Sequence, residues 1–422
     1  MPSPRSLEDW LRLQEIVHST GIDLTLERVR EVARRMGLLP PAARVITVAG
    51  TNGKGSTVAC LAALLRALGH KAGAFTSPHL LRYHERIRVD GAEAGDAELV
   101  SAFEAIEAAR GGITLTFFEF NALAALEVFR RRQVEFAVLE VGLGGRLDAV
   151  NIVDAEAAIV CSIGLDHADW LGTDIDAIGR EKAGVFRPGH IAVMADPQMT
   201  PAVEQEARRI GARALVAGRD YDWVHEPDRQ QWSFRRGGFV LGELPLPALA
   251  GGRQLANASA ALATLHAMGV LGQHHAPAVS RALRSLALPG RFQVVPGRVE
   301  WILDVAHNEA AATTLARNLA ERPCSGRTLC VTSILADKDI DAVARALAGQ
   351  VHAWFVCGLD APRGLTAGAL ASRSTVFAGA TQCLDIAAGM RAAAAAAAPG
   401  DRIVVCGSFL AVAPALEQLG LF

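Results

Sequence analysis

The segment that most constrains the fold runs from residue 44 to residue 69 and reads RVITVAGTNGKGSTVACLAALLRALG. A β-branched run leads into a glycine-rich turn, and the turn leads into a helix-length stretch that ends at Gly69, a residue suited to a helix C-cap. Glycines let backbone N–H groups approach an anion closely, and a strand that feeds a helix aims the helix N-terminus at that anion. The order therefore predicts an α/β sheet with a phosphate-binding turn.

The turn differs from the common phosphate-binding loop, GxxxxGK followed by Ser or Thr. Here Gly50 and Gly53 are separated by only two residues, and Gly55 stands between Lys54 and Ser56. Lys54 would supply a positive charge for the β- and γ-phosphates, whereas an incidental lysine in a glycine-rich turn is the alternative. The nucleotide-binding residues predicted in this turn are Gly50, Thr51, Asn52, Gly53, Lys54, Gly55 and Ser56.

Strand and helix patterns alternate on both sides of a boundary near Pro289-Gly290. FAVLEVGLGG and AAIVCSIGLDH precede it and indicate buried parallel strands, while VEWILDVAHN, TLCVTSI, HAWFVCGL and DRIVVCGSF follow it. A length of 422 residues exceeds what one core usually supports. We expect an α/β protein of two domains: residues 1–288 form a P-loop ATPase-type domain with a small β-hairpin excursion at 221–247, and residues 289–422 form a Rossmann-like domain.

Composition excludes several classes of partner. The net charge is −2, so nothing is basic enough for a nucleic-acid surface, and no run of Lys or Arg indicates an anionic membrane surface. The apolar stretches are too short to span a bilayer, and MPSPRSLEDWLRLQEIV lacks the apolar core of a signal peptide. Seven scattered cysteines without a CxxC pair indicate reduced thiols. We expect a cytoplasmic monomer.

The variant turn GTNGKGS resembles that of the ATP-dependent folylpolyglutamate synthases and dihydrofolate synthases, relatives of the muramyl ligases. Further segments match this family in the family's order, and residues 200–250 alone show no signature. These segments are TSPHLLRYHERIRV, TFFEFNALAAL, EVGLGGRLDAVN, GLDHADWLGTDIDAIGREKAGVFRPG, LPGRFQ, LDVAHN, DKDIDAV and GSFLAVAPALE. The resemblance implies a bifunctional enzyme that adds L-glutamate to 7,8-dihydropteroate and to reduced folates, with ATP, through an acyl phosphate.

The resemblance also implies a Mg²⁺ site made by Ser77, Glu140 and His167. Glu140 ends an apolar strand, where a carboxylate faces the ligand-binding end of an open sheet, although capping of the following glycine turn is the alternative. Because Mg²⁺ prefers oxygen, His167 on chemistry alone indicates a general base or a zinc ligand. Ser77 before Pro78 alone indicates a helix cap.

Lys182 in GREKAGVFRPG has two opposite interpretations. An isolated lysine after a polar helix start is ordinarily a solvated surface residue. The family places a carbamylated lysine at this position, and its carbamate, made from the ε-amine and CO₂, turns a cation into an anion that supports the metal site. On the resemblance, the catalytic set is Lys54, His167 and Lys182.

Further nucleotide contacts are implied for four residues that match the family: Asn257, Arg291, Asp304 and His307. Arg291 lies at the expected hinge, where domain closure would deliver its charge to the phosphates. The alternative for Asp304, or for its neighbour Asn308, is N-capping of the following helix. Lys338 is another candidate cation, unless Asp337 and Asp339 neutralise it.

Two segments, GIDLTLERV at 21–29 and TFFEF at 116–120, resemble the dihydropteroate-binding segments of bifunctional family members. Phe117 and Phe118 would present an aromatic face to a flat pterin ring, or would pack in the core. Asp148 is a further candidate, and Arg146 a candidate for a glutamate carboxylate. The predicted substrate-binding residues are Ile22, Asp23, Leu24, Thr116, Phe117, Phe118, Glu119, Arg146 and Asp148.

Three alternatives remain open. The first is an enzyme confined to polyglutamylation, and the second a muramyl-type ligase. The muramyl option is weakened by IDLTLERV and by a phosphate loop that begins by residue 50, which leaves no separate UDP-binding domain before it. The third is a P-loop NTPase that drives a conformational change in a partner, but the sequence has no DExx-type strand end and no arginine-finger element.

Overall fold

The structure is a computed structural model that describes residues 6–18 and 22–421. The chain forms two compact units. Unit 1 comprises Met1–Ile163, Leu171–Pro247 and Leu255–Leu286, and unit 2 comprises Gly164–Trp170, Ala248–Gln254 and Ala287–Phe422. A single boundary near residue 289 therefore does not describe the chain fully, because two short earlier segments group with the C-terminal unit.

Unit 1 is built on an eight-stranded sheet with the order β4-β3-β2-β5-β1-β6-β7-β8. Its strands are β1 (Arg44–Ala49), β2 (Ala72–Phe75), β3 (Ile87–Val89), β4 (Ala92–Glu93), β5 (Phe136–Glu140), β6 (Ala157–Val160), β7 (Ile191–Met194) and β8 (Arg213–Val216). The strands from β2 to β8 in this order are parallel, and β3 and β4 are antiparallel additions at one edge. The predicted parallel strands are confirmed, and their continuous apolar runs reflect burial on both faces.

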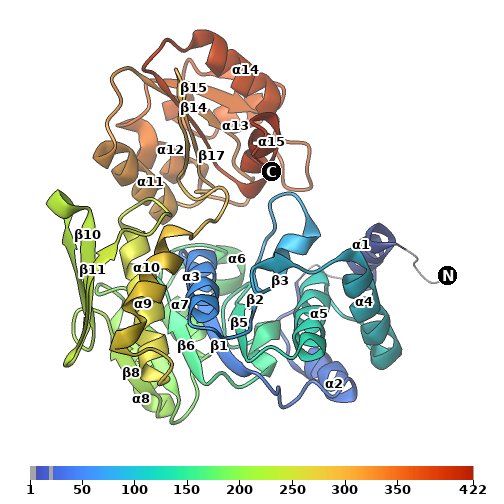
Figure 1. Cartoon of the computed structure of the whole chain (residues 1–422). Helices are drawn as coiled ribbons and strands as arrows, with labels where there is room; N and C mark the ends of the chain where they lie inside the picture. Colours follow the sequence, from blue (N-terminus) through green and yellow to red (C-terminus); the bar gives the residue numbers. More distant parts are fainter. Residues whose placement is uncertain (1–5, 19–21, 422) are drawn as a thin grey trace. The chain divides into compact units, whose positions relative to one another are not determined.

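Helices cover both faces of this sheet. They are α1 (Leu7–Ile16), α2 (Glu27–Arg35), α3 (Lys54–Ala67), α4 (Asp96–Arg110), α5 (Phe117–Arg132), α7 (Ile175–Ala183), α8 (Pro201–Ile210), α9 (Arg253–Ala267) and α10 (Ala276–Arg284). Helices α3 and α10 pack against each other on one face, with α9 beside them (Figure 1). Right-handed crossovers put α5, α7 and α8 on the opposite face. Gly69 follows α3 with a φ of +88°, as a C-cap glycine requires.

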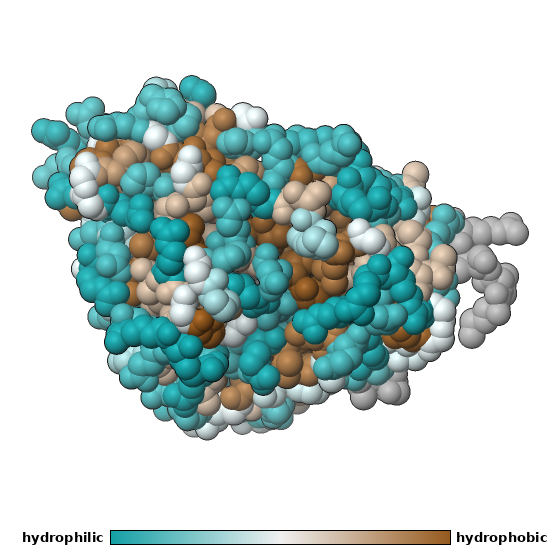
Figure 2. All heavy atoms as spheres, turned by 90° about the horizontal axis from the view of Figure 1, so that it is seen from below, coloured by the Kyte–Doolittle hydropathy of each residue, from teal (hydrophilic) through white to brown (hydrophobic). Residues whose placement is uncertain are grey.

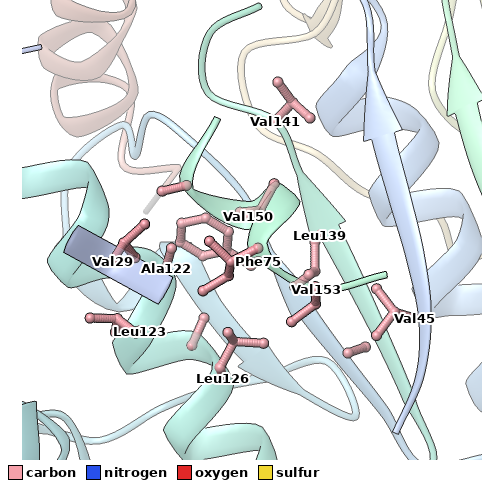
Figure 3. Packing of buried hydrophobic residues seen from close by; sticks show 14 of the residues in the cluster. Val29, Val45, Phe75, Ala122, Leu123, Leu126, Leu139, Val141, Val150 and Val153 are labelled. Atoms are coloured by element: carbon pink, nitrogen blue, oxygen red, sulfur yellow. The ribbon is translucent and has the colours of Figure 1, made fainter. Parts of the chain in front are cut away.

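The core of unit 1 fixes the start of α5 at the carboxyl ends of the strands. Figure 3 shows Val29 of α2 and Leu123 of α5 near Phe75 of β2 and Leu139 of β5. The side chains of Phe75, Leu123 and Leu139 are almost completely buried. Since α5 runs antiparallel to β5, the first residues of α5 lie beside the carboxyl end of β5.

The excursion in residues 221–247 is a three-stranded antiparallel sheet with the order β11-β10-β9. Its strands are β9 (Asp222–Glu226), β10 (Gln231–Arg236) and β11 (Phe239–Pro245). The predicted Gly237-Gly238 turn joins β10 to β11. The prediction of one hairpin was incomplete, because β9 adds a third strand to β10.

Unit 2 contains a six-stranded sheet with the order β12-β13-β17-β14-β15-β16, and only β12 pairs antiparallel in it. The strands are β12 (Gln293–Val295), β13 (Glu300–Leu303), β14 (Thr328–Thr332), β15 (Ala353–Cys357), β16 (Thr381–Cys383) and β17 (Arg402–Cys406). The helices are α11 (Glu309–Glu321), α12 (Ile340–Ala348), α13 (Ala367–Ala371), α14 (Ile386–Ala396) and α15 (Phe409–Gln418). This agrees with the predicted Rossmann-like domain, to which the structure adds the edge strands β12 and β16.

The surface mixes polar and apolar side chains. On the face shown in Figure 2, hydrophilic residues predominate and apolar ones gather near the centre. Among the residues that the structure describes, no helix is both long and apolar enough to cross a bilayer. A cavity of about 460 Å³ lies at the amino ends of β1 and β6 and is lined in part by Arg44, Glu156 and His190. The cavity therefore lies at the amino ends of the strands, whereas Glu140 and the phosphate-binding turn lie at their carboxyl ends.

Candidate active site

The predicted phosphate-binding turn connects β1 to α3, and its glycines are required by conformation and by space. Gly50 has a φ of +145° and Gly53 a φ of +90°. A Cβ at Gly50 would lie 3.0 Å from the Cβ of Cys161, and one at Gly53 would lie 2.9 Å from Oδ1 of Asn257. The first N–H groups of α3, which begins at Lys54, have no partner within the helix and can face an anion.

Lys54 lies folded back over this turn. Its Nζ donates to the carbonyl oxygen of Gly50 at 2.9 Å and to that of Thr51 at 3.1 Å. Ser162 supports the turn from the end of β6: its Oγ accepts from the Asn52 N–H at 3.0 Å and donates to the Asn52 carbonyl at 3.0 Å. Sequence reasoning did not single out Ser162, although a hydroxyl just after a strand end was a usable signal.

Glu140 and Ser77 lie beside each other. The Ser77 N–H donates to Oε2 of the buried Glu140 at 3.2 Å. The capping alternative for Glu140 is wrong, since the N–H groups of Gly142 and Leu143 donate to Oδ2 of Asp148, at 3.0 and 2.9 Å. Ser77 is not a helix cap either, because it lies in the loop between β2 and the short helix η1 (Tyr83–Arg86).

Lys182 is buried near the end of α7, with 5% of its surface exposed. The surface alternative is therefore wrong. A Cβ at Gly145 would lie 2.8 Å from the Lys182 carbonyl oxygen, so the glycine turn after β5 packs directly on this helix end. Burial raises the pKa of the Cys161 thiol to about 11, while the charges of Lys54, Glu140 and Lys182 also act on it. These three charged residues therefore gather around the end of β6.

Asp148 and Arg146 lie on the same glycine turn. Besides Gly142 and Leu143, the Val150 N–H donates to the Asp148 carboxylate at 3.0 Å. Burial raises the pKa of Asp148 to about 7, although these N–H groups and the charge of Lys54 act in the opposite direction. Arg146 is half exposed and pairs with Glu181 at 2.9 Å. In this state, Asp148 holds the turn in place and Arg146 is engaged in an ion pair.

The two segments that resemble dihydropteroate-binding segments meet through Arg28 of α2. Its Nη1 donates to Oδ2 of Asp23 at 2.6 Å and its Nη2 to Oε1 of Glu119 at 3.1 Å. Thr116 and Glu119 also form a reciprocal capping box at the start of α5. Sequence reasoning did not single out Arg28. Ile22 and Leu24 lie in the same segment, of which residue 21 is outside the described residues.

Phe117 and Phe118 are half-buried at the start of α5. Their exposure is therefore intermediate between that of a core residue and that of a ring fully open to a pterin. A Cβ at Gly142 would lie 2.6 Å from the Phe118 ring, whose centroid is 5.7 Å from that of Phe75. The Phe117 ring faces Arg86, with 5.3 Å between its centroid and the guanidinium carbon. Both rings thus combine packing contacts with a partly accessible surface.

In unit 2, Arg291, Asp304 and His307 lie near one another at the carboxyl end of β13. The Asp304 carboxylate accepts the N–H groups of Phe292 and Ala306, each at 2.8 Å. Burial raises the pKa of Asp304, and the charge of Arg291 opposes this. Asn308, and not Asp304, caps α11, because its Oδ1 accepts the Ala311 N–H at 2.9 Å.

Lys338 pairs with Asp166, a residue that sequence reasoning did not select. Their side chains are 7% and 8% exposed, and Nζ lies 2.5 Å from Oδ1. The Asp166 carboxylate also accepts from Nδ2 of Asn308 at 2.9 Å and lies 3.4 Å from Nε2 of His307. Burial alone would raise the pKa of Asp166, but the His307 hydrogen bond and the Lys338 charge hold it well below its usual range.

The alternative that Asp337 and Asp339 neutralise Lys338 is wrong. Asp337 pairs with Arg363 at 2.8 Å, and Asp339 caps α12 through the Ala342 N–H at 3.0 Å. His167 follows Asp166 with a φ of +52° and lies in the segment Gly164–Trp170, which groups with unit 2. Ser77 and Glu140, the other two residues predicted for the metal, belong to unit 1.

Replacing Lys338 with methionine should lower the free energy of unfolding of unit 2 by about 3–5 kcal/mol, because it leaves the Asp166 carboxylate buried without its cation. Denaturant unfolding, together with hydrogen exchange across α12, measures this loss. Arg363→Met is the matched control: its ion pair with Asp337 is 59% and 26% exposed, so the expected loss is below about 1 kcal/mol. Equal losses of unfolding free energy in both variants would contradict the conclusion that the buried Lys338–Asp166 pair stabilises unit 2.

Family models and relatives match the chain over almost its whole length. The Mur ligase middle domain matches residues 48–265, and the Mur ligase glutamate ligase domain matches residues 290–409. The dihydrofolate synthase/folylpolyglutamate synthase of Escherichia coli K12 is 44% identical over 414 residues, 98% of this chain and 95% of that protein. The protein of that name from Mycobacterium tuberculosis is 32% identical over 404 residues, 88% of this chain and 82% of its own.

Solved structures agree with the sequence relatives. E. coli FolC in complex with DHPP and ADP superimposes with a TM-score of 0.94 at 42% identity, covering 99% of both chains. The Yersinia pestis bifunctional folylpolyglutamate synthase/dihydrofolate synthase, complexed with AMPPNP and Mn ion, gives a TM-score of 0.92 at 42% identity over 99% of this chain and 100% of that one. With the phosphate-binding turn and both matched domains, these similarities show that the chain belongs to the dihydrofolate synthase/folylpolyglutamate synthases, ATP-dependent ligases of the Mur ligase family.

Proposed function

We propose that this protein joins L-glutamate to 7,8-dihydropteroate and to reduced folates, with ATP as co-substrate. The observation that carries the proposal is the match to bifunctional synthases over 98% of the chain. The two pterin-type segments, which Arg28 holds together, support the dihydropteroate half. We further propose that it acts as a cytoplasmic monomer on small molecules and not on nucleic acid, and light scattering of the purified protein tests the monomer.

The reaction proceeds in two transfers. A carboxylate oxygen of the pterin or folate acid attacks the γ-phosphorus of ATP, the bond to ADP breaks, and an acyl phosphate forms. The glutamate amine then attacks the acyl carbon and inorganic phosphate leaves. Such transfer depends on positioning and on neutralising charge. Lys54 supplies the charge beside the turn, and the N–H groups at the start of α3 supply donors for phosphate oxygens.

Four further residues are proposed to bind the nucleotide. Asn257 supports the role because its side chain lies against Gly53 of the phosphate turn. Arg291, Asp304 and His307 support it because they gather after β13 within unit 2, with the Asp304 carboxylate fixed by two N–H groups. Arg291 supplies a further cation for the phosphates.

The residues at the ends of β2 and β5 fit a Mg²⁺ ion. Ser77 and Glu140 offer a hydroxyl and a carboxylate, and the Ser77 N–H already orients that carboxylate. Within the described part of the chain, no three His, Cys, Asp or Glu side chains form a metal-binding group by themselves. Mg²⁺ is usually held by one or two carboxylates, and water and phosphate oxygens complete its shell. His167 is the proposed third ligand, and the ion would neutralise phosphate charge.

Lys182 is proposed to carry a carbamate. Its burial near Glu140 and Lys54 supports the proposal, because a modified side chain there places an anion beside the metal ligands. Arg146 and Asp148 are proposed to contact substrate from the glycine turn, whose position Asp148 maintains.

One coupled assay tests the whole function. Dihydropteroate and tetrahydrofolate are offered separately with ATP and glutamate, and phosphate release and amide product are followed together. The bifunctional proposal expects product with each acid and phosphate release only when acid and glutamate are both present. Product from tetrahydrofolate alone would leave a folylpolyglutamate synthase, and phosphate release without either substrate would favour an NTPase.

Replacing Phe118 with alanine should raise KM for dihydropteroate at least tenfold and leave KM for ATP nearly unchanged, because the ring is proposed to stack on the pterin. Steady-state kinetics with each substrate varied in turn measure this. Phe118→Leu is the control for packing against Gly142 and Phe75: it keeps apolar volume and loses the aromatic face. If the leucine variant is as active as the parent, or if both variants lose ATP affinity equally, the ring serves packing alone.

A further inference from the structure

The loop between β2 and β3 carries a buried cation that the proposed function has not used. Arg86, the last residue of η1, is only 7% exposed. Burial lowers the pKa of its guanidinium, and nearby Tyr83, Glu140 and Glu85 oppose this. A guanidinium nevertheless remains charged in proteins, and a buried charge is costly unless it has partners. The groups that contact the Arg86 guanidinium therefore indicate whether its charge is satisfied within the protein or by a ligand.

These surroundings fix the plane of the guanidinium and leave donors unused. Nε of Arg86 donates to Nδ1 of His79 at 2.7 Å. The guanidinium carbon lies 5.3 Å from the ring centroid of Phe117 and 5.9 Å from that of Tyr83. Among the described residues, Nη1 and Nη2 of Arg86 make no hydrogen bond or ion pair.

The adjacent carboxylate of Glu85 acts on Arg86 through its charge but forms no hydrogen bond with the guanidinium. Both oxygens of Glu85 accept backbone N–H groups, from Leu80, Leu81 and Arg82, at 2.6 to 2.8 Å. The Glu85 side chain thus ties the loop to itself. A guanidinium held by one neutral ring nitrogen and two aromatic faces, with its fork free of protein partners, is arranged to receive an anion from outside the chain.

The position of Arg86 indicates which anion. The Phe117 ring, which lies against Arg86, belongs to the segment proposed to bind the pterin acid. Glu140, a proposed metal ligand whose carboxylate accepts the Ser77 N–H, is close enough for its charge to act on Arg86. A pterin acid lying on the aromatic residues would direct its carboxylate toward the metal ligands, because that is where it must meet the γ-phosphoryl group.

We propose that Arg86 binds the carboxylate of the pterin acid and holds it for phosphorylation, an inference that rests on the proposed function. The Nη1 and Nη2 groups donate to the two carboxylate oxygens as a fork. This offsets the repulsion between two anions that have to approach each other. Arg86 neither accepts a proton nor forms a covalent bond, and His79, Tyr83 and Phe117 are positioning residues that keep its plane fixed.

The test compares two ligands that differ by one group: dihydropteroate and the same compound without its carboxyl group. Calorimetry with the full-length protein should show the parent binding the acid at least tenfold more tightly than the analogue. Arg86→Met keeps an apolar stem of similar length and should abolish that preference, with the affinities for the analogue and for AMPPNP unchanged. Arg86→Lys keeps the charge without the fork and should retain only part of the preference.

Arg88→Met is the matched control, since Arg88 lies two residues along and pairs with Glu93 at 3.0 Å. It should keep the full preference for the acid. Equal weakening of both ligands in Arg86→Met would overturn the proposal, as would a parent that binds acid and analogue equally. If Arg86→Met does not fold, Arg86→Lys decides, and an undiminished preference there would overturn the proposal. A parent that binds neither pterin compound would refute the proposed function itself.

Discussion

Replacing Lys182 with alanine should give a folded protein that forms no detectable amide at ordinary bicarbonate. The loss would be among the largest for any single substitution, because it removes the proposed carbamate and with it an anion beside Glu140. A small carboxylic acid such as acetate should restore part of the turnover by filling the vacated anion position. Single-turnover amide formation measures both effects, and a ¹³C carbamate resonance from labelled bicarbonate should be present in the parent and absent in the variant.

Lys71→Ala is the control for the Lys182 experiment. Residue 71 lies immediately before β2 and is not buried, so its replacement should leave turnover and the carbamate resonance unchanged. Full activity of Lys182→Ala, or a carbamate resonance that survives the substitution, would show that the lysine is unmodified and serves packing only.

Replacing Glu140 with glutamine should lower kcat by about 10³-fold or more while the protein stays folded. The reason is that the proposed role of this carboxylate is to bind a metal ion, which contributes several kcal/mol of charge stabilisation in the transition state. The amide oxygen can still accept the Ser77 N–H, so the local geometry is kept and only the negative charge is lost. A titration of turnover against Mg²⁺, with thermal unfolding in parallel, separates weaker metal binding from instability.

Glu135→Gln provides the comparison for Glu140→Gln. Glu135 lies just before the same strand, is 53% exposed and pairs with His70 at 2.9 Å. Its replacement should not change kcat. A Glu140→Gln variant with parental kcat across the Mg²⁺ range would remove Glu140 from the metal site.

The parts of this molecule that were predictable from sequence are those whose signal is local. The phosphate turn was recognisable because strand, glycines, lysine and helix follow one another within residues 44–69. The central parallel strands were recognisable because burial on both faces leaves continuous apolar runs. Strands β12 and β16, with three residues each, are too short to show any periodicity.

The parts that sequence reasoning missed depend on contacts between distant segments. Lys182 looks like a surface residue in isolation and was selected only through the family resemblance; its burial comes from distant segments that pack on α7, among them the glycine turn after β5. Asp166 lies 172 positions before Lys338, so no local pattern could pair them. Thr116 and Glu119 differ from these cases: the T-x-x-E spacing is a legible capping box, and the resemblance drew attention to ligand binding instead.

The grouping of Gly164–Trp170 with the C-terminal unit limits how members of this family can be recombined. A fragment that starts at Ala287 contains every strand of the six-stranded sheet but lacks Asp166. The Lys338 ammonium would then have lost the carboxylate with which it pairs. A chimera that exchanges only the C-terminal segment inherits the Asp166–Lys338 pair from two different parents. Interchange should succeed when residues 164–170 and 248–254 are exchanged together with that segment, because the unit is encoded in three separate stretches of the chain.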